Sequence, residues 1–323
     1  MKNIKLLLTF LSCLAFYANA AFPQLSSNNI NTDRLLTNFK YLSSDELAGR
    51  KPQTSGHLLA QKYITQEYKT NNLLSFNVNY QHTFNYESSR QNKHGVNLLG
   101  YVTGIKYPNL YWVVTAHYDH LGDNGRSVFN GADDNASGVA AMLALSRYFS
   151  EHPPQYSIIF LATDAEEDGL KGAKEFISNP PVPLDAIVLN INLDMLSQDA
   201  KWKTLYVAGT RGNKNLKTVI SHTNELLQTN SFKLKRGHDR VGGGRLSNKL
   251  KPIDWKKASD HSEFRKKNIA YLYFGVDTHK DYHTVNDTFE NANISFYLQG
   301  VNAILVSLQQ LEQLLPQQIQ SNN

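Results

Sequence analysis

The fold is decided by one stretch near the middle of the chain, Ser157-Ile-Ile-Phe-Leu-Ala-Thr-Asp-Ala-Glu-Glu-Asp-Gly169. Its first part, Ser157 to Ala162, is a short apolar run that predicts a β-strand. A run without polar alternation is typical of a strand that helices cover on both faces. The acids Glu166 and Glu167 follow it directly, at the place where open α/β sheets bind ligands. The stretch therefore predicts a buried sheet with a functional site at its carboxyl edge.

Further strands and helices alternate along the chain. We expect strands at residues 96–102, 110–116, 186–193, 204–207 and 269–274, an edge hairpin at 75–95, and helical segments at 31–74, 137–150 and 298–315. The fold class is α/β, a three-layer sandwich with a mixed, mostly parallel central sheet flanked by helices. Without repeats or a long linker, residues 21–315 form a single domain. Pro316 should end the last helix before a disordered tail at 316–323.

The first twenty residues have the pattern of a signal peptide. Lys2 and Lys5 precede an apolar stretch, and Ala18-Asn19-Ala20 resembles a cleavage site. The apolar stretch is too short for an ordinary membrane-spanning helix. We therefore expect an exported protein, secreted or periplasmic, with no stable membrane insertion after cleavage. The alternatives are an uncleaved N-terminal anchor and lipidation of Cys13.

The composition excludes several kinds of site. Cys13 is the only cysteine and would leave with the signal peptide, so disulfides, thiolate metal ligands and a cysteine nucleophile are not expected. The formal net charge is only +5, and no basic stripe with interleaved aromatic residues runs through the chain, which argues against a nucleic-acid partner. Residues 232–257 are rich in Lys and Arg, and form either a surface loop or a basic wall of a substrate cleft.

Five short segments rich in acids and histidines follow or end apolar runs. They are Ala116-His-Tyr-Asp-His120, Gly131-Ala-Asp-Asp-Asn135, Glu166-Glu167, Asn192-Leu-Asp-Met195 and Asp281-Tyr-His-Thr284. Buried carboxylates and imidazoles cost free energy unless they are paired or bound to metal, so several at strand ends predict one shared site. Oxygen ligands mixed with imidazoles suit zinc or a similar divalent ion. The combination indicates metal-assisted hydrolysis.

Neighbouring side chains in these segments should have different duties. At a strand end or turn the side chains of Glu166 and Glu167 diverge, so one can bind metal while the other faces the attacking water. On a strand His117 and Asp119 point the same way, which would let the Asp119 carboxylate fix the imidazole. His120 we expect to be structural or solvent-facing. Taken singly, each segment also has a plainer interpretation, such as a helix cap for Asp134.

Taken together, the motifs resemble those of the zinc aminopeptidases of the M28 family. The resemblance rests on Ala-His-Tyr-Asp-His-Leu-Gly at 116–122, Gly-Ala-Asp-Asp-Asn-Ala-Ser-Gly at 131–138, Glu-Glu-Asp-Gly-Leu-Lys-Gly at 166–172, Asn-Leu-Asp-Met at 192–195 and Asp-Tyr-His-Thr at 281–284. Ser-Asp-Glu-Leu-Ala-Gly-Arg at 44–50 and Ser-Asp-His-Ser-Glu-Phe at 259–264 extend it over most of the chain. Val285 departs from it, because many relatives have proline there.

The resemblance implies two zinc ions per chain and a role for each site residue. His117 and Asp194 would hold one ion, Glu167 and His283 the other, with Asp134 as the bridge. It also implies a cis peptide between Asp134 and Asn135, Glu166 as the general base, and a hydrogen bond from Tyr282 to the developing oxyanion.

The expected activity is that of an exported, metal-dependent aminopeptidase acting on peptide substrates. The rivals are glutaminyl cyclase chemistry, which related enzymes carry out on a similar fold with a single zinc, and carboxypeptidase or dipeptidase specificity. A non-catalytic binding protein on the same fold is the rival from another class, since fold does not fix function.

Overall fold

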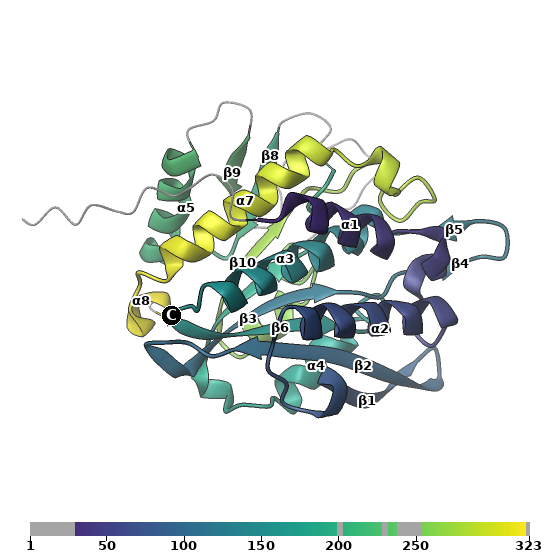
Figure 1. Ribbon diagram of the computed structural model, residues 1–323, viewed down its shortest axis with the longest axis horizontal. Coiled ribbons are helices and arrows are strands. Elements are labelled where there is room, and N and C mark those ends of the chain that lie inside the picture. Colours follow the sequence, from purple (N-terminus) through teal and green to yellow (C-terminus); the bar gives the residue numbers. More distant parts are fainter. Residues whose placement is uncertain (1–29, 199–202, 228–231, 238–253, 321–323) are drawn as a thin grey trace, which may run out of the picture.

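The computed structural model describes residues 30–198, 203–227, 232–237 and 254–320. Its centre is an eight-stranded sheet of order β1-β2-β6-β3-β7-β10-β8-β9, with helices packed over it (Figure 1). The predicted three-layer α/β sandwich is confirmed. The predicted signal peptide, Cys13 and most of the basic segment lie outside the described residues. The strands are β1 (Gln81–Ser88), β2 (Gln91–Val102), β3 (Tyr107–His117), β6 (Tyr156–Thr163), β7 (Ile187–Leu193), β8 (Thr204–Ala208), β9 (Lys233–Arg236) and β10 (Ala270–Gly275).

The four central strands, β6, β3, β7 and β10, all run parallel. β2 and β8 flank them in the antiparallel direction, and β1 and β9 form the two edges. Every residue of β6 and of β7 is buried, as expected for strands covered on both faces. Because the central strands are parallel, their carboxyl ends all meet at one edge of the sheet.

Alternating side chains of the sheet pack into two cores. Ile158 and Phe160 of β6 join the larger core, together with residues of α1, α2, α3, α5 and α7. Ile159 and Leu161 point to the other face, into a smaller core with residues of α4 and α6. The helices are α1 (Thr32–Leu42), α2 (Ser55–Thr70), α3 (Gly138–Glu151), α4 (Lys171–Ser178), α5 (Lys214–Leu227), α6 (His261–Lys266), α7 (Ile294–Leu311) and α8 (Pro316–Gln320).

Most predicted elements occur close to their expected positions. The helical segment at 31–74 contains α1 and α2, whose first turns are capped by the side chains of Asn31 and Thr54. The predicted edge hairpin is the antiparallel pair β1–β2, in which β2 continues to Val102. The basic segment begins as the edge strand β9, so a loop is the wrong interpretation for Lys233–Arg236.

The predicted disordered tail is wrong for residues 316–320, which form the helix α8. Proline lacks an N–H and fits the first turn of a helix, so Pro316 begins α8. The Ile319 side chain is fully buried, and its carbonyl accepts a hydrogen bond of 2.8 Å from Asn213 Nδ2. A single apolar anchor and side-chain hydrogen bonds therefore order a segment of polar composition. Residues 321–323 lie outside the described residues.

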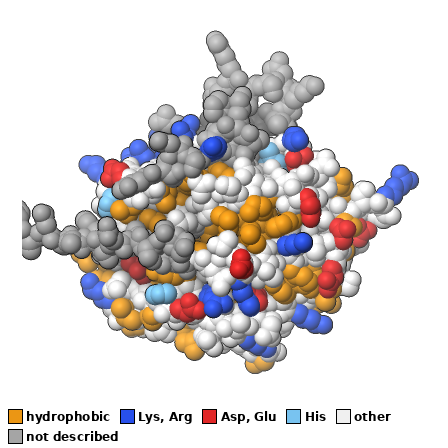
Figure 2. Space-filling model, turned by 45° about the horizontal axis from the view of Figure 1, so that its top comes forward, with side chains coloured by type: hydrophobic (Ala, Val, Ile, Leu, Met, Phe, Trp, Pro, Cys, Tyr) orange, Lys and Arg blue, Asp and Glu red, His pale blue; other side chains and the backbone are white. Residues whose placement is uncertain are grey.

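Charges of both signs are interspersed on the surface. On the face drawn in Figure 2, Lys and Arg side chains alternate with Asp and Glu around hydrophobic groups, without a large field of one sign. Within the described ranges, no helix combines the length and the apolar character needed to cross a bilayer.

Candidate metal centre and active site

A cavity of about 270 Å³ opens at the carboxyl edge of the sheet. The ends of β3, β6, β7 and β10 meet there, so side chains that are distant in the sequence face one another. The predicted site residues in its lining are His117, Asp134, Glu166, Glu167, Asp194 and Tyr282. The other residues that line it are Met195, Trp255, Ala258, Tyr273, Val276 and Thr278.

The two carboxylate oxygens of Asp134 face two different histidines. Oδ1 lies 3.1 Å from His117 Nε2, and that same nitrogen is 3.4 Å from Asp194 Oδ1. Oδ2 lies 2.9 Å from His283 Nε2, which is 3.4 Å from Glu167 Oε1. Asp134 therefore stands between two ligand groups and touches both. The Asp134–Asn135 peptide is cis, as the resemblance implied.

His120 lies beside the second group, and of the two expected roles, structural or solvent-facing, the solvent-facing one is wrong. Its side chain is buried, and Nδ1 lies 3.0 Å from Glu167 Oε1 and 3.9 Å from Asp134 Oδ2. Strand alternation would turn His120 away from His117, but β3 ends at His117 and the rule no longer applies. The structure therefore adds a histidine to this side of the centre.

The donor atoms of both groups fit divalent metal ions. Buried atoms without a hydrogen-bond partner include Glu167 Oε1, Asp194 Oδ1, His283 Nε2 and both ring nitrogens of His120. Leaving such atoms unpaired is costly unless an ion satisfies them. Two ligand sets, His117 with Asp134 and Asp194, and His120 with Asp134 and Glu167, each place their donor atoms within 4.8 Å of one another. Imidazole nitrogens and carboxylate oxygens are ligands that zinc accepts.

Glu166 differs from its neighbour, although it lines the same cavity. In the described part of the chain it forms none of the histidine contacts that hold Glu167. Burial raises the pKa of Glu166 well above its ordinary range; the His117 charge opposes this rise, and the negative charges of Glu167 and Asp194 add to it. A carboxyl group with a raised pKa is suited to proton transfer near neutral pH.

The Asp119 carboxylate holds the turn that carries both glutamates. Oδ1 accepts a hydrogen bond of 3.0 Å from the Glu166 amide, and Oδ2 accepts one of 3.3 Å from the Glu167 amide. The expected contact with the imidazole is instead made by the Asp119 carbonyl, 3.2 Å from His117 Nδ1, whereas the carboxylate is 3.8 Å away. Asp119 thus positions the glutamate turn through its side chain and His117 through its backbone.

A network of acids ties the Tyr282–His283 loop to the bridging aspartate. Asp287 accepts hydrogen bonds from the amides of Asp133 and Asp134, at 2.8 and 3.1 Å. Asp133 Oδ2 lies 3.0 Å from His279 Nε2. The loop is therefore fastened on both sides of His283. Sequence reasoning missed His279 and Asp287, whose pairing with Asp133 has no local signal.

A buried arginine, Arg50, holds the segments that carry His117 and Asp134. Arg50 is 1% exposed, and its guanidinium donates to the carbonyls of Tyr118, Asn130 and Gly131, and to that of Leu42. Burial lowers the pKa of Arg50 to about 10, while Asp134 and the other acids nearby act in the opposite direction, so it stays charged at neutral pH. The Ser-Asp-Glu-Leu-Ala-Gly-Arg motif marked this residue without revealing its contacts.

Aromatic residues form one side of the cavity. The Tyr282 ring stacks on the His283 imidazole at a centroid distance of 3.9 Å, and Trp255 packs edge-on against Tyr273 at 5.2 Å. Burial raises the pKa of the Tyr282 phenol, and the acids nearby raise it further, so the hydroxyl stays protonated and can donate a hydrogen bond. Of the predicted basic wall only residues 232–237 and 254–257 are described, and Trp255 is the one that lines the cavity.

The chain is similar to known proteins both in sequence and in fold. Aminopeptidase YwaD of Bacillus subtilis is 29% identical over 195 residues, which is 58% of this chain and 38% of YwaD. The match thus spans less than half of that relative's length. Among solved structures, glutaminyl cyclase of Fimbriiglobus ruber superposes with a TM-score of 0.70 at 18% identity, covering 89% of this chain and 98% of the cyclase. BSAP, a zinc aminopeptidase from Bacillus subtilis, has a TM-score of 0.68 at 16% identity, covering 88% and 97%.

The structural likenesses establish the shared fold, and the sequence supplies the family. A model of peptidase family M28 matches residues 97–306, a segment that runs from β2 into α7 and contains every predicted metal ligand. This match covers well over half of the 323 residues. The chain therefore belongs to peptidase family M28.

Proposed function

We propose that the protein is a zinc-dependent aminopeptidase that removes N-terminal residues from peptides. The observation that carries the proposal is the position of Asp134, whose two oxygens face separate ligand groups while Glu166 stays outside both. Family membership and the likeness to aminopeptidase YwaD support the same reaction class. One ion would be held by His117 and Asp194, a second by Glu167 and His283, and Asp134 would bridge them.

The chain's own residues have distinct tasks in this proposal. When bound, the ions would polarise the scissile carbonyl and lower the pKa of a water molecule. Glu166 accepts the proton of the attacking water at its carboxylate and returns it to the departing amine. The Tyr282 hydroxyl donates a hydrogen bond to the carbonyl oxygen as negative charge develops there. Asp119 keeps Glu166 in place by holding its amide.

The charge of the cavity favours an aminopeptidase over a carboxypeptidase. Among the described residues that line it, none is lysine or arginine, and four are acids. The described lining therefore offers no lysine or arginine to a C-terminal carboxylate, whereas Glu166, the one lining acid that is not a proposed metal ligand, would attract an N-terminal ammonium. A cavity of about 270 Å³ also suits the terminal part of a peptide better than a long segment.

The deciding experiment replaces Glu166 with glutamine, which keeps the side chain's size and removes the base. We expect kcat/KM on aminoacyl-nitroanilides to fall by about 10²–10⁴-fold with zinc content unchanged. Glu151→Gln, at an exposed glutamate of α3, is the matched control and should retain activity. Normal turnover by Glu166→Gln would show that the base is misassigned.

The number of ions is tested separately. We expect two zinc ions per wild-type chain by elemental analysis, and fewer in Asp134→Ala, because that side chain touches both groups. Two ions retained in the variant would contradict the bridging role.

Glutaminyl cyclase chemistry is the rival to exclude, because a solved cyclase shares the fold. The second ligand group at Glu167 and His283 favours the peptidase, since one ion needs only the first group. Cyclisation of a peptide with N-terminal glutamine, without release of free amino acids, would decide for the rival.

Export is the other part of the proposal. It is supported by the basic start, apolar stretch and small-residue site within residues 1–20. N-terminal sequencing of the protein recovered outside the cytoplasm should begin after Ala20.

A further inference from the structure

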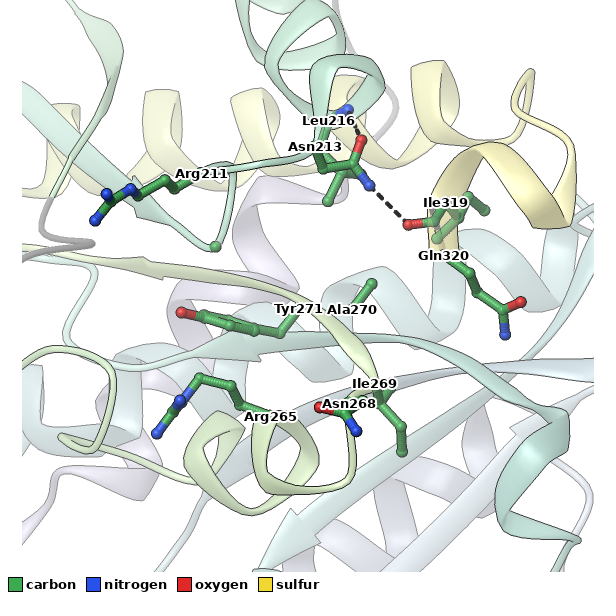
Figure 3. A pocket seen from close by; sticks show the side chains of 11 residues that line it. Arg211, Asn213, Leu216, Arg265, Asn268, Ile269, Ala270, Tyr271, Ile319 and Gln320 are labelled. Carbon is green, nitrogen blue, oxygen red and sulfur yellow. Dashed lines mark hydrogen bonds between the residues drawn. The ribbon is translucent and has the colours of Figure 1, made fainter. Parts of the chain in front are cut away.

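A second cavity, of about 200 Å³, lies beside the first residues of β10, where α8 packs against the rest of the protein (Figure 3). β10 begins at this cavity with Ala270 and Tyr271 and ends at the candidate active site. The two cavities therefore lie at opposite ends of one strand, and none of the catalytic or metal-binding residues lines this one.

Two arginines from different elements supply its charge. Arg211 lies in the loop before α5, and Arg265 in α6. Figure 3 shows their side chains on either side of Tyr271, both extending in the same direction as the Tyr271 ring. Arg265 Nε donates to the Lys256 carbonyl at 3.2 Å, which leaves the two terminal nitrogens of that guanidinium for other partners. In the described part of the chain no acid pairs with either arginine or lines the cavity.

The part of the lining away from the arginine side chains is fixed by the fold. Asn213 has both ends of its amide engaged, accepting from the Leu216 amide at 3.0 Å and donating to the Ile319 carbonyl at 2.8 Å. Gly209 has a φ of +94°, and a Cβ there would lie 2.0 Å from the Tyr271 carbonyl oxygen. The backbone at Gly209 therefore lies so close to β10 that it leaves no room for a side chain. This part of the lining does not have to become ordered when a ligand binds.

We propose that this cavity is a binding site for a small dianionic oxyanion, either a phosphate or a compact dicarboxylate. Two guanidiniums with no acidic partner among the described residues favour a ligand that carries two negative charges, because each can donate paired hydrogen bonds to oxygen atoms. A volume of about 200 Å³ admits only a small molecule. Free amino acids do not fit this chemistry, because the described lining offers no acid for their ammonium group. We therefore do not expect this cavity to bind the amino acids that the proposed reaction would release.

The test is a calorimetric titration of the zinc-loaded full-length protein with inorganic phosphate and, separately, with succinate at low ionic strength. Arg211→Gln and Arg265→Gln should each weaken binding by about tenfold or more, since each removes charge-assisted hydrogen bonds. Arg126→Gln is the matched control, because it removes the same charge from the exposed turn between the short strands β4 (Gly122–Asp123) and β5 (Val128–Phe129). Circular dichroism verifies the fold of each variant.

The outcomes separate the two ligand sources from a failure of the idea. Arginine-dependent binding of phosphate alone indicates a tetrahedral oxyanion as the natural ligand, and binding of succinate alone indicates a dicarboxylate. Because oxyanions can also coordinate zinc, binding that persists in the double variant Arg211→Gln/Arg265→Gln belongs elsewhere and overturns the proposal. No binding of either anion, or equal weakening by Arg126→Gln, overturns it too.

Discussion

Arg50→Lys is the substitution that most directly tests how the site segments are held. Arg50 makes four buried hydrogen bonds to carbonyl oxygens, three of them in the segments next to His117 and Asp134. Lysine keeps the charge, but its donors radiate from a single nitrogen instead of a planar fork. We expect it to retain no more than two of the four bonds.

The cost follows from the number of bonds lost. A hydrogen bond from a charged donor contributes about 1.5–3 kcal/mol, so losing two lowers the free energy of unfolding by about 3–6 kcal/mol. This is a large part of the roughly 5–15 kcal/mol that stabilises a typical domain. The free energy of unfolding should fall by about 3 kcal/mol for each molar increase in urea, so the urea concentration at the unfolding midpoint should be about 1–2 M lower in the variant.

The assay is urea unfolding of the metal-free protein, followed by circular dichroism, so that lost metal binding does not add to the difference. Arg147→Lys is the matched control, because Arg147 makes an exposed pair with Glu151 at 3.0 Å and should change stability by less than about 0.5 kcal/mol. If Arg50→Lys unfolds within 0.5 kcal/mol of the wild type, by the same criterion, the four bonds do not hold these segments as argued.

Two further predictions concern proton linkage and the loop that carries His283. Burial raises the pKa of Glu312 from 4.5 to about 7, so the folded protein prefers the neutral acid and loses stability as the pH rises through that range. Glu312→Gln should therefore be more stable than wild type at pH about 8, with a free energy of unfolding higher by on the order of 1–3 kcal/mol after solvent screening. Thermal unfolding should show a higher midpoint for the variant at that pH and no such gain at pH about 5. A difference independent of pH would refute this. His279→Ala removes one fastening of the loop and should weaken zinc binding by about 10–100-fold in chelator competition. Exposed His94→Ala is its control, and equal affinities in both variants would count against the fastening.

The sheet could be predicted from the sequence because its strands are encoded locally. β6 and β7 are apolar along their length, and only a strand covered on both faces buries such a run completely. Once the strands are parallel, the residues after them must share one edge, so His117, Glu167 and Asp194 could be assigned to one site in advance.

Contacts between distant residues could not be predicted in this way. Asp287 and the Asp133 amide are 154 positions apart, and the Asp133–His279 contact spans 146. Nothing in a local pattern distinguishes such an acid from one that faces solvent. The prediction of a disordered tail was wrong for a related reason. The hydrogen bond that helps to order α8 joins Asn213 to the Ile319 carbonyl, 106 positions away.

The different duties proposed for Glu166 and Glu167 arise from the backbone and not from their chemistry, which is identical. Both amides bond to the one Asp119 carboxylate, so the turn is fixed as a unit and the two side chains leave it in different directions. One direction brings Glu167 Oε1 to 3.0 Å from His120 and 3.4 Å from His283, among the ligand groups. The other leaves Glu166 facing the cavity, where burial raises its pKa and none of the described histidines holds it. An acid that is bound gains a ligand's role and loses its basicity, so the division requires a turn that keeps the pair apart, and Asp119 provides it.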